Sequence, residues 1–198
     1  MMQDLPRFRT VLAVSLVIGA GTVLVPASLE KLGAFGTAVE RRSEPSTAMR
    51  ERQRLTRDLF VAGQIDAGDI AHAKSLGFRT VIALRPDGEA AGQPDSVTMG
   101  VLVRESGLAF AYVPVPQGEL PDAVADALGA ALARAEGPVL LYCRSGRRAA
   151  RAWAVAEASR PGGLALDDIQ AAAAGTGHAV DDLAARLAER HAQRAPRG

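Results

Sequence analysis

The stretch VLLYCRSGRRAARAW, residues 139–153, joins an apolar run to an arginine-rich turn and an alanine-rich helix. A continuous apolar run such as residues 138–143 is typical of a strand buried on both faces of a parallel sheet. Cys143, the only cysteine in the sequence, stands at the carboxyl end of that predicted strand. Ligands of α/β sheets bind beyond the carboxyl ends of the strands. The stretch therefore predicts a central strand and the position of a site.

The segments on either side alternate between predicted strands and helices. Further strands are predicted at residues 59–63, 78–84 and 108–115, and helices at residues 66–77, 96–107, 120–137, 166–177 and 179–191, with one more around Trp153. Asp66 and Asp69 have the spacing of a capping box, and Gly77 that of a helix end. The alternation predicts an α/β fold class: a three-layer domain with a central, mostly parallel sheet flanked by helices.

The composition narrows the possible functions. The 198 residues, 48% of them hydrophobic, are enough for one α/β domain. A formal net charge of +1 gives no reason to expect a nucleic-acid partner. A single cysteine cannot form an intramolecular disulfide, so the fold has to depend on its core.

Residues 1–30 are predicted to form a membrane anchor or a signal segment, with an apolar helix. Residues 10–29 carry no charge, and a helix of that length, at about 1.5 Å per residue, would span a hydrocarbon core of about 30 Å. Arg7 and Arg9 before the apolar residues are also typical of a secretory signal peptide. We expect a protein anchored through residues 10–29 or exported, unless Met49 is the true start, in which case we expect it to be cytoplasmic.

The rest of the chain divides into three predicted segments. Residues 31–56 are rich in arginine and lack apolar periodicity, which is typical of a basic linker. Residues 57–178 hold the predicted strands and the cysteine, and form the predicted catalytic domain. Residues 179–198 are predicted to be a C-terminal helix with a basic tail.

The turn after residue 142 has the features of an anion-binding loop. The helix that follows would direct its positive end toward Cys143, and such a setting favours the thiolate form of cysteine. Gly146 lets the backbone curl so that its N–H groups point inward, Ser145 adds a hydroxyl, and Arg148 supplies a planar guanidinium. We predict Cys143 as the nucleophile and Arg148 as the second catalytic residue. The alternative is that Cys143 merely fills the core, as free cysteines often do.

The loop CRSGRR, residues 143–148, resembles the active loops of two enzyme classes. Rhodanese-type sulfurtransferases have a similar six-residue loop that begins with Cys and ends in Arg or Thr. Cysteine phosphatases of the protein-tyrosine and dual-specificity kind have a similar loop, but their Arg comes six residues after the Cys, where this chain has Ala149. A shorter loop encloses a smaller space, which suits a persulfide sulfur, so the spacing favours sulfur transfer.

A resemblance to one family covers most of residues 55–178. The chain is similar to the phosphatase-like domain of beta-lactamase-hydrolase-like proteins in the stretches LFVAGQIDAGDI (59–70), GFRTVIALRPDGEAAGQP (77–94) and GPVLLYCRSG (137–146). Members are described as phosphatases or as sulfurtransferases, so the resemblance implies a rhodanese-like or cysteine-phosphatase-like fold. The chain departs from the family at Arg147, where a small residue is common, and in its N-terminal apolar segment.

No metal site or cofactor is predicted. Relatives are often joined to a metallo-hydrolase or to a persulfide-oxidising partner, whose His-x-His-x-Asp-His signature this sequence does not contain. His72, His178 and His191 are scattered along the sequence and are interpreted as histidines on helix surfaces.

The predicted function is that of a rhodanese-like, cysteine-dependent sulfurtransferase. The Cys143 thiolate would take a sulfane sulfur from a small anionic donor such as thiosulfate and hold it as a persulfide. A thiol acceptor such as glutathione would then remove that sulfur. Arg144, Arg147 and Arg148 would bind the anionic group of the donor.

The first alternative is a phosphatase that forms a phosphocysteine intermediate from a phosphoester substrate. It needs an acid to protonate the leaving oxygen, and the candidates are Asp87, Glu119 and Asp122. Asp87 is also explained by an ordinary Pro-Asp-Gly turn, and Asp122 by the start of a helix. The second alternative is an inactive module that binds anions without turnover.

Overall fold

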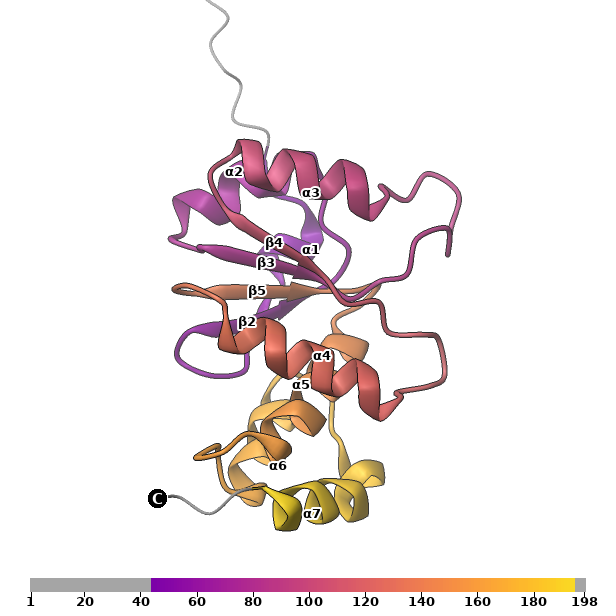
Figure 1. The fold of residues 1–198 in the computed structure, drawn as a ribbon. Helices are drawn as coiled ribbons and strands as arrows, with labels where there is room; N and C mark the ends of the chain where they lie inside the picture. Colours follow the sequence, from indigo (N-terminus) through magenta and orange to yellow (C-terminus); the bar gives the residue numbers. More distant parts are fainter. Residues whose placement is uncertain (1–43, 195–198) are drawn as a thin grey trace, which may run out of the picture. The chain divides into compact units, whose positions relative to one another are not determined.

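The computed structural model describes residues 44–194. Its centre is a five-stranded sheet in the order β1-β2-β5-β3-β4 (Figure 1). The strands are β1 (Gln53–Arg54), β2 (Leu59–Ala62), β3 (Thr80–Ala83), β4 (Ala109–Tyr112) and β5 (Val139–Tyr142). Four strands run parallel, and β1 pairs antiparallel with β2 at the edge. The predicted α/β class with a mostly parallel sheet is confirmed, and the strand before Cys143 lies in the middle of the sheet.

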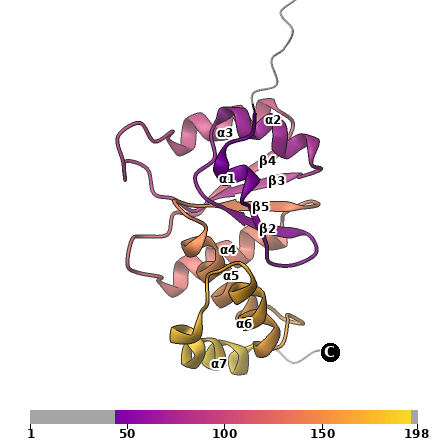
Figure 2. The ribbon, with the colours of Figure 1, turned by 180° about the vertical axis from the view of Figure 1, so that it is seen from behind.

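Helices cover both faces of the sheet. The short α1 (Thr47–Arg50), α2 (Ala67–Ser75) and α3 (Ser96–Glu105) lie on one face, and α4 (Asp122–Ala133) and α5 (Arg147–Ser159) lie on the other (Figures 1 and 2). Beyond α5 lie α6 (Leu166–Gly175), the short 3-10 helix η1 (Asp181–Leu183) and α7 (Ala184–Gln193). The two outer helices add a layer that the three-layer prediction did not include.

The period-2 alternation of β5 decides which face receives the cysteine. Leu140 and Tyr142 belong to the hydrophobic cluster beneath α2 and α3. Leu141 and Cys143 belong to the cluster that contains α4 and α5. Since successive side chains of a strand point to opposite faces, Cys143 projects toward the α5 side of the sheet.

The start of α2 ties the chain before the sheet to the domain. Asp66 and Asp69 form the predicted capping box, in which each carboxylate accepts a hydrogen bond from the other residue's N–H, at 3.1 and 3.0 Å. The buried Asp69 carboxylate also accepts hydrogen bonds from the N–H of Ser46, at 2.8 Å, and from its hydroxyl, at 2.6 Å. A buried carboxylate needs such partners, so Ser46 satisfies Asp69 while it anchors the N-terminal segment.

The folded domain therefore begins earlier than the predicted boundary at residue 57. Helix α1 and strand β1 lie inside residues 31–56, the segment predicted to be a basic linker. Met49 is fully buried in the cluster beneath α2 and α3, and Leu55 is buried on the opposite side of the sheet. Two isolated apolar residues produce no periodicity, which is why the sequence does not reveal that this segment is packed.

The predicted anchor or signal segment and the apolar helix in residues 1–30 lie outside the described residues. So does the part of the predicted linker before residue 44. Within residues 44–194, no helix is both long enough and apolar enough to cross a bilayer.

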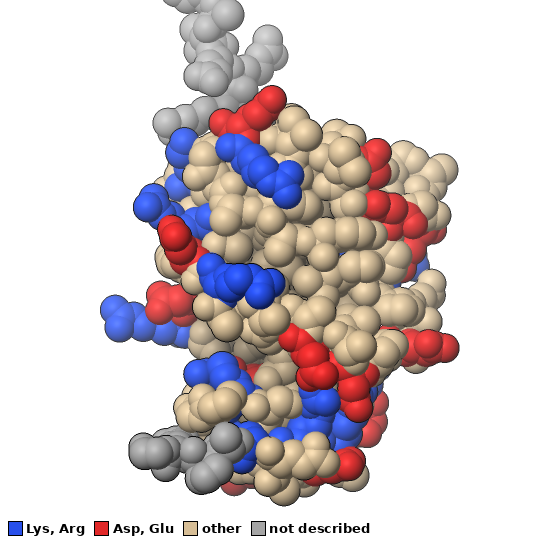
Figure 3. Space-filling view, viewed as in Figure 1, with Lys and Arg blue, Asp and Glu red and all other residues tan. Residues whose placement is uncertain are grey.

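The C-terminal segment packs firmly onto the domain. Val180 and Leu187 are buried in the same cluster as Cys143. Arg186 forms an ion pair with Asp122 on α4, so α7 is held against α4 as well as against α5. Acidic and basic surfaces alternate where α4 faces α7 (Figure 3). The predicted C-terminal helix thus contributes to the core, while residues 195–198 lie outside the described residues.

Candidate active site

Cys143 directly follows the central strand β5, and the residue is almost completely buried. The residue is 1% exposed, whereas Arg144 and Ser145 directly after it are exposed. Its N–H donates to the Ala62 carbonyl of β2 at 3.4 Å, and the Arg144 carbonyl accepts from the Gln64 N–H at 3.3 Å. The loop is therefore attached to the neighbouring strand on the same edge of the sheet. Burial fits the interpretation as a core filler, but the charged groups around the thiol do not.

Gly146 makes the sharp turn from the loop into α5. Its φ of 87° lies in the left-handed region, which side chains other than glycine rarely adopt. A Cβ atom at this position would lie 3.0 Å from Nε2 of His178. As the N-cap, Gly146 offers no side-chain acceptor to the first turn of α5, so the N–H groups at that end are available to an anion. The predicted role of Gly146 in shaping the loop agrees with this geometry.

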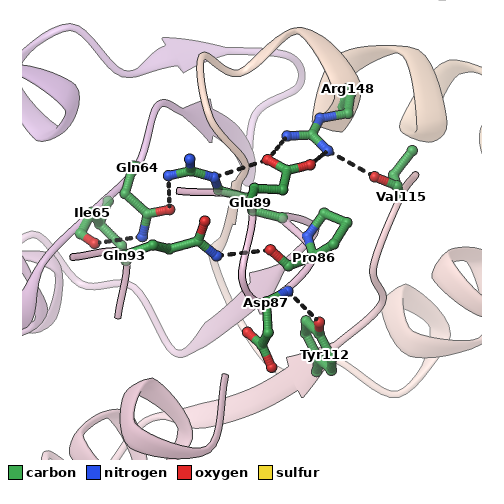
Figure 4. Close-up of polar contacts among 10 residues, drawn as sticks. Gln64, Ile65, Pro86, Asp87, Glu89, Gln93, Tyr112, Val115 and Arg148 are labelled. Atoms are coloured by element: carbon green, nitrogen blue, oxygen red, sulfur yellow. Dashed lines mark hydrogen bonds and ion pairs between the residues drawn. The ribbon is translucent and has the colours of Figure 1, made fainter. Parts of the chain in front are cut away.

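Arg148 is held by a carboxylate that the sequence did not single out. Its Nη1 and Nη2 donate to the two carboxylate oxygens of Glu89 at 2.5 and 2.7 Å, and Nη1 also donates to the Val115 carbonyl at 2.8 Å (Figure 4). The pKa of Arg148 is raised, first by the hydrogen bond with Glu89 and further by the neighbouring Cys143 side chain. Arg148 thus lies beside the thiol, and its guanidinium is held in one orientation by the carboxylate of Glu89.

A second arginine, Arg85, also forms an ion pair with Glu89. Arg85 Nε donates to Glu89 at 3.0 Å, and its Nη1 donates to the side-chain oxygen of Gln64, also at 3.0 Å. Hydrogen bonding from Arg148 is the largest cause that lowers the pKa of Glu89, and Arg85 adds to it against the opposing effect of burial. Glu89 is therefore ionised and belongs to a hydrogen-bonded chain of polar side chains that runs from Gln64 through Arg85 and Glu89 to Arg148 (Figure 4).

A sequence signal for Glu89 did exist. Arg85 and Glu89 lie in the loop that follows β3, and β3 pairs in parallel with β5. The residues after both strands must meet at one edge of the sheet. What the sequence could not tell is which of the carboxylates in residues 85–95 turns toward the arginine.

Asp87 forms hydrogen bonds that stabilise the loop after β3. Its carboxylate accepts from the N–H and the hydroxyl of Ser96 at 2.8 and 2.7 Å. Its own N–H donates to the Tyr112 hydroxyl at 3.0 Å (Figure 4). These bonds join the loop after β3 to the start of α3. Of the two interpretations of Asp87, the turn residue fits the structure and the acid does not.

The other two acid candidates are separated by their surroundings. Asp122 pairs with Arg186 and, at 3.3 Å, with Arg190. The hydrogen bond from Arg186 is the main cause that lowers the pKa of Asp122, which makes this carboxyl a poor proton donor. Glu119 instead lines a cavity together with Arg144 and the rest of the loop.

This cavity lies beside the cysteine loop and has a volume of about 780 Å³. One wall is the segment from Val115 to Leu120, and the other is formed by the loop, α5 and the C-terminal segment. Five arginines and one carboxylate, Glu119, are among the described residues that line it: Arg144, Arg147, Arg148, Arg151 and Arg186. The cavity is therefore suited to anionic molecules of moderate size.

The histidines do not all lie as predicted. His72 and His191 lie on α2 and α7, but the prediction that His178 is on a helix surface is wrong, because it follows the turn at Gly177 and contacts the cysteine loop. Burial lowers the pKa of His178, and a hydrogen bond with the Ser145 backbone opposes this effect. Among residues 44–194, no three His, Cys, Asp or Glu side chains are grouped so that they could hold a metal ion.

Solved structures of phosphatase-like proteins share this fold. The candidate phosphatase nma1982 of Neisseria meningitidis superposes with a TM-score of 0.61 and 27% identity, over 71% of this chain and 98% of that one. A candidate phosphatase of Shewanella putrefaciens superposes with a TM-score of 0.58 and 22% identity, over 86% of this chain and 99% of that one. Kinase associated phosphatase superposes with a TM-score of 0.57 and 13% identity, over 73% of this chain and 96% of that one. At the low identity of these last two structures, the comparison shows a likeness of fold alone.

Sequence relatives give the family. The beta-lactamase hydrolase-like protein of Xylella fastidiosa strain 9a5c is 34% identical over 140 residues, which are 70% of this chain and 32% of that protein. Its namesake in Agrobacterium fabrum is 33% identical over 111 residues, 56% of this chain and 25% of that protein. The chain therefore spans about a third or less of these curated relatives. Residues 51–160 match the model of the family described as "Beta-lactamase hydrolase-like protein, phosphatase-like domain". Because this match covers more than half of the residues, the chain belongs to that family of phosphatase-like hydrolases with a cysteine nucleophile.

Proposed function

We propose that this protein is a cysteine-dependent phosphatase that hydrolyses phosphate monoesters through a phosphocysteine at Cys143. This reverses the order predicted from the spacing of the loop, in which sulfur transfer to a thiol acceptor came first. Membership of a phosphatase-like family and the likeness to nma1982 support the phosphatase. The observation that carries the proposal is the placement of Cys143 beside Arg148 at the amino end of α5, next to a cavity rich in arginine.

In the first step, the Cys143 thiolate attacks phosphorus and the bond from phosphorus to the ester oxygen breaks. The N–H groups that begin α5 and the guanidinium of Arg148 stabilise the charge that develops on the remaining phosphoryl oxygens. In the second step, water attacks phosphorus, the phosphorus–sulfur bond breaks, and inorganic phosphate and the thiolate are released.

Glu89 acts as the positioning residue for Arg148. A guanidinium on a flexible side chain would lose entropy each time it bound a phosphoryl group. The two-point contact with Glu89 and the contact with the Val115 carbonyl remove this freedom in advance. The hydrogen atoms of Arg148 that face neither partner remain to bind the substrate.

Glu119 is the proposed acid. It is the one carboxylate among the described residues that line the cavity, and it would give a proton to the leaving oxygen in the first step and accept one from water in the second. Asp87 and Asp122 are held by Ser96 and by arginines of α7.

Sulfur transfer remains a second candidate because of the spacing of the loop. Arg148 follows Cys143 by five residues rather than six. The short spacing makes a small loop, which is suited to a single sulfur atom. In that case Cys143 would carry a persulfide and Arg148 would bind an anionic donor.

The direct test is mass spectrometry of the protein after brief exposure to p-nitrophenyl phosphate. The phosphatase predicts a phosphoryl group on Cys143, release of phosphate over many turnovers, and loss of both in Cys143→Ser. The same protein incubated with thiosulfate and cyanide should form no thiocyanate above the level of Cys143→Ser. An added sulfur on Cys143 with rapid thiocyanate formation and no phosphate release would instead establish the second candidate. Anion binding by both proteins, with neither reaction, would indicate the inactive module.

A further inference from the structure

The arginines of the cavity outnumber what one phosphoryl group needs. Arg148 and the first N–H groups of α5 lie at the cysteine and can hold a single phosphoryl group. Arg147 and Arg151 stand four residues apart on α5, so they share one face of the helix. Arg186 comes from α7 and lines the same cavity. A row of guanidinium groups therefore leads from the loop toward the C-terminal helix.

Some of these arginines already have carboxylate partners, but the partners are exposed. Arg151 donates to both oxygens of Asp182 at 2.7 and 2.6 Å, and Arg186 pairs with Asp122. The Asp182 and Asp122 side chains are 61% and 64% exposed. Because these two carboxylates lie largely in solvent, an incoming phosphate can replace either of them as the partner of its arginine.

Arg147 provides a further cation without such a partner. Along residues 44–194, neither Arg147 nor Arg144 forms an ion pair with a carboxylate. Both are exposed, and both line the cavity. A guanidinium that lines a cavity without a carboxylate partner attracts anionic groups, and two of them belong to the loop itself.

The dimensions of the cavity indicate the kind of molecule. A volume of about 780 Å³ lies in the range of sites for small molecules, about 300–1,000 Å³. Val115, Leu120 and Leu183 give it apolar wall between the charged groups. A compact molecule with a phosphate at each end and a short organic spacer fits this pattern of charge.

We propose that Arg147, Arg151 and Arg186 form a second phosphate subsite, so that the preferred substrates are small organic bisphosphates. This inference rests on the proposed phosphatase function, since it places one phosphate at Cys143 and the other about a helix turn or more away along α5. The second phosphate is not hydrolysed in the bound orientation. It contributes binding energy and fixes which end of the molecule meets the thiol.

The kinetic test compares fructose 1,6-bisphosphate with fructose 6-phosphate, which lacks the second group. We expect kcat/KM of the wild-type protein to be about tenfold or more higher for the bisphosphate, the effect of one or two charge-assisted hydrogen bonds. Arg151→Gln and Arg186→Gln should reduce that ratio toward the value of two that two equivalent esters give by statistics, mainly through KM. Arg186→Lys should recover part of it. Arg134→Gln removes an exposed arginine outside the cavity and should leave the ratio unchanged.

The binding test separates this inference from the proposed function. Calorimetry with the Cys143→Ser protein, which cannot turn over, should show tighter binding of the bisphosphate than of the monophosphate, and this difference should shrink in Cys143→Ser/Arg151→Gln. If the wild-type protein hydrolyses no phosphate ester while this pattern of binding holds, the proposed function fails and the subsite stands. If the wild-type protein hydrolyses monoesters with no preference for the bisphosphate, the subsite is refuted. A tyrosine-phosphorylated peptide hydrolysed far better than either sugar phosphate would also refute it.

Discussion

Glu89 and Arg148, 59 residues apart in the sequence, form a two-point ion pair at the carboxyl edge of the sheet, with nitrogen–oxygen distances of 2.5 and 2.7 Å. The pair joins the loop after β3 to the first turn of α5. Both side chains are largely buried, 15% and 17% exposed, so the contact is shielded from water and salt. The orientation of the arginine beside Cys143 is thus decided by a residue on another loop.

Replacement of Glu89 should reduce activity more than it reduces stability. Glu89→Gln keeps the shape but removes the charge that both Arg85 and Arg148 contact. We expect phosphatase kcat to fall by about tenfold or more, with a loss of about 1–3 kcal/mol in the free energy of unfolding. The measurements are steady-state kinetics and urea denaturation. Glu105→Gln, at an exposed site on α3, should change neither quantity, and an equal loss in both variants would contradict the assigned role of Glu89.

The same ion pair predicts a dependence of stability on pH. Hydrogen bonding from Arg148 lowers the pKa of Glu89 below its ordinary value of 4.5. A carboxyl whose pKa is depressed by folding stabilises the protein above its unfolded pKa, and this contribution is lost as the pH falls through the folded pKa. The difference in unfolding free energy between wild type and Glu89→Gln should therefore be constant near neutrality and shrink below about pH 4.5. A difference that stays constant down to pH 3 would show that the charge of Glu89 is irrelevant.

Gly146 should not tolerate a side chain. Its φ of 87° is strained for alanine, by about 1–2 kcal/mol, and the new Cβ would lie 3.0 Å from His178 Nε2. Gly146→Ala should lower the thermal midpoint and reduce turnover, because the first N–H groups of α5 would shift relative to Cys143. Gly175→Ala is the matched control: that site has open space and no positive φ, so stability should stay equal or rise. A Gly146→Ala protein with wild-type turnover would argue against the loop as the catalytic element.

The proposed role of Glu119 as the acid predicts that its replacement affects substrates with poor leaving groups most. An acid matters most for poor leaving groups, so Glu119→Gln should slow hydrolysis of an alkyl phosphate by about a hundredfold and that of p-nitrophenyl phosphate far less. Asp122→Asn breaks the contact between α4 and α7 and should affect both substrates alike. If Asp122→Asn alone produced the dependence on leaving group, the acid would have to be reassigned.

The central part of the fold follows from local sequence patterns. The apolar residues 138–143 and the alanine-rich segment after them specify a buried strand and a helix, and both occur where they are expected. The capping box at Asp66 and Asp69 and the positive φ of Gly146 follow equally from residue chemistry. These features depend on residues near each other in the chain, and for that reason the sequence reveals them.

The sequence by itself determined that Cys143 ends a central strand before an arginine-rich turn. Tertiary structure alone decided that Glu89 rather than Asp87 faces Arg148, that His178 lies against the loop, and that Met49 belongs to the core. Each of these contacts joins segments far apart in the chain, and its partner is selected by the direction in which a loop leaves the sheet. Local propensity carries no information about that direction, because it is set only when the helices pack on the two faces of the sheet.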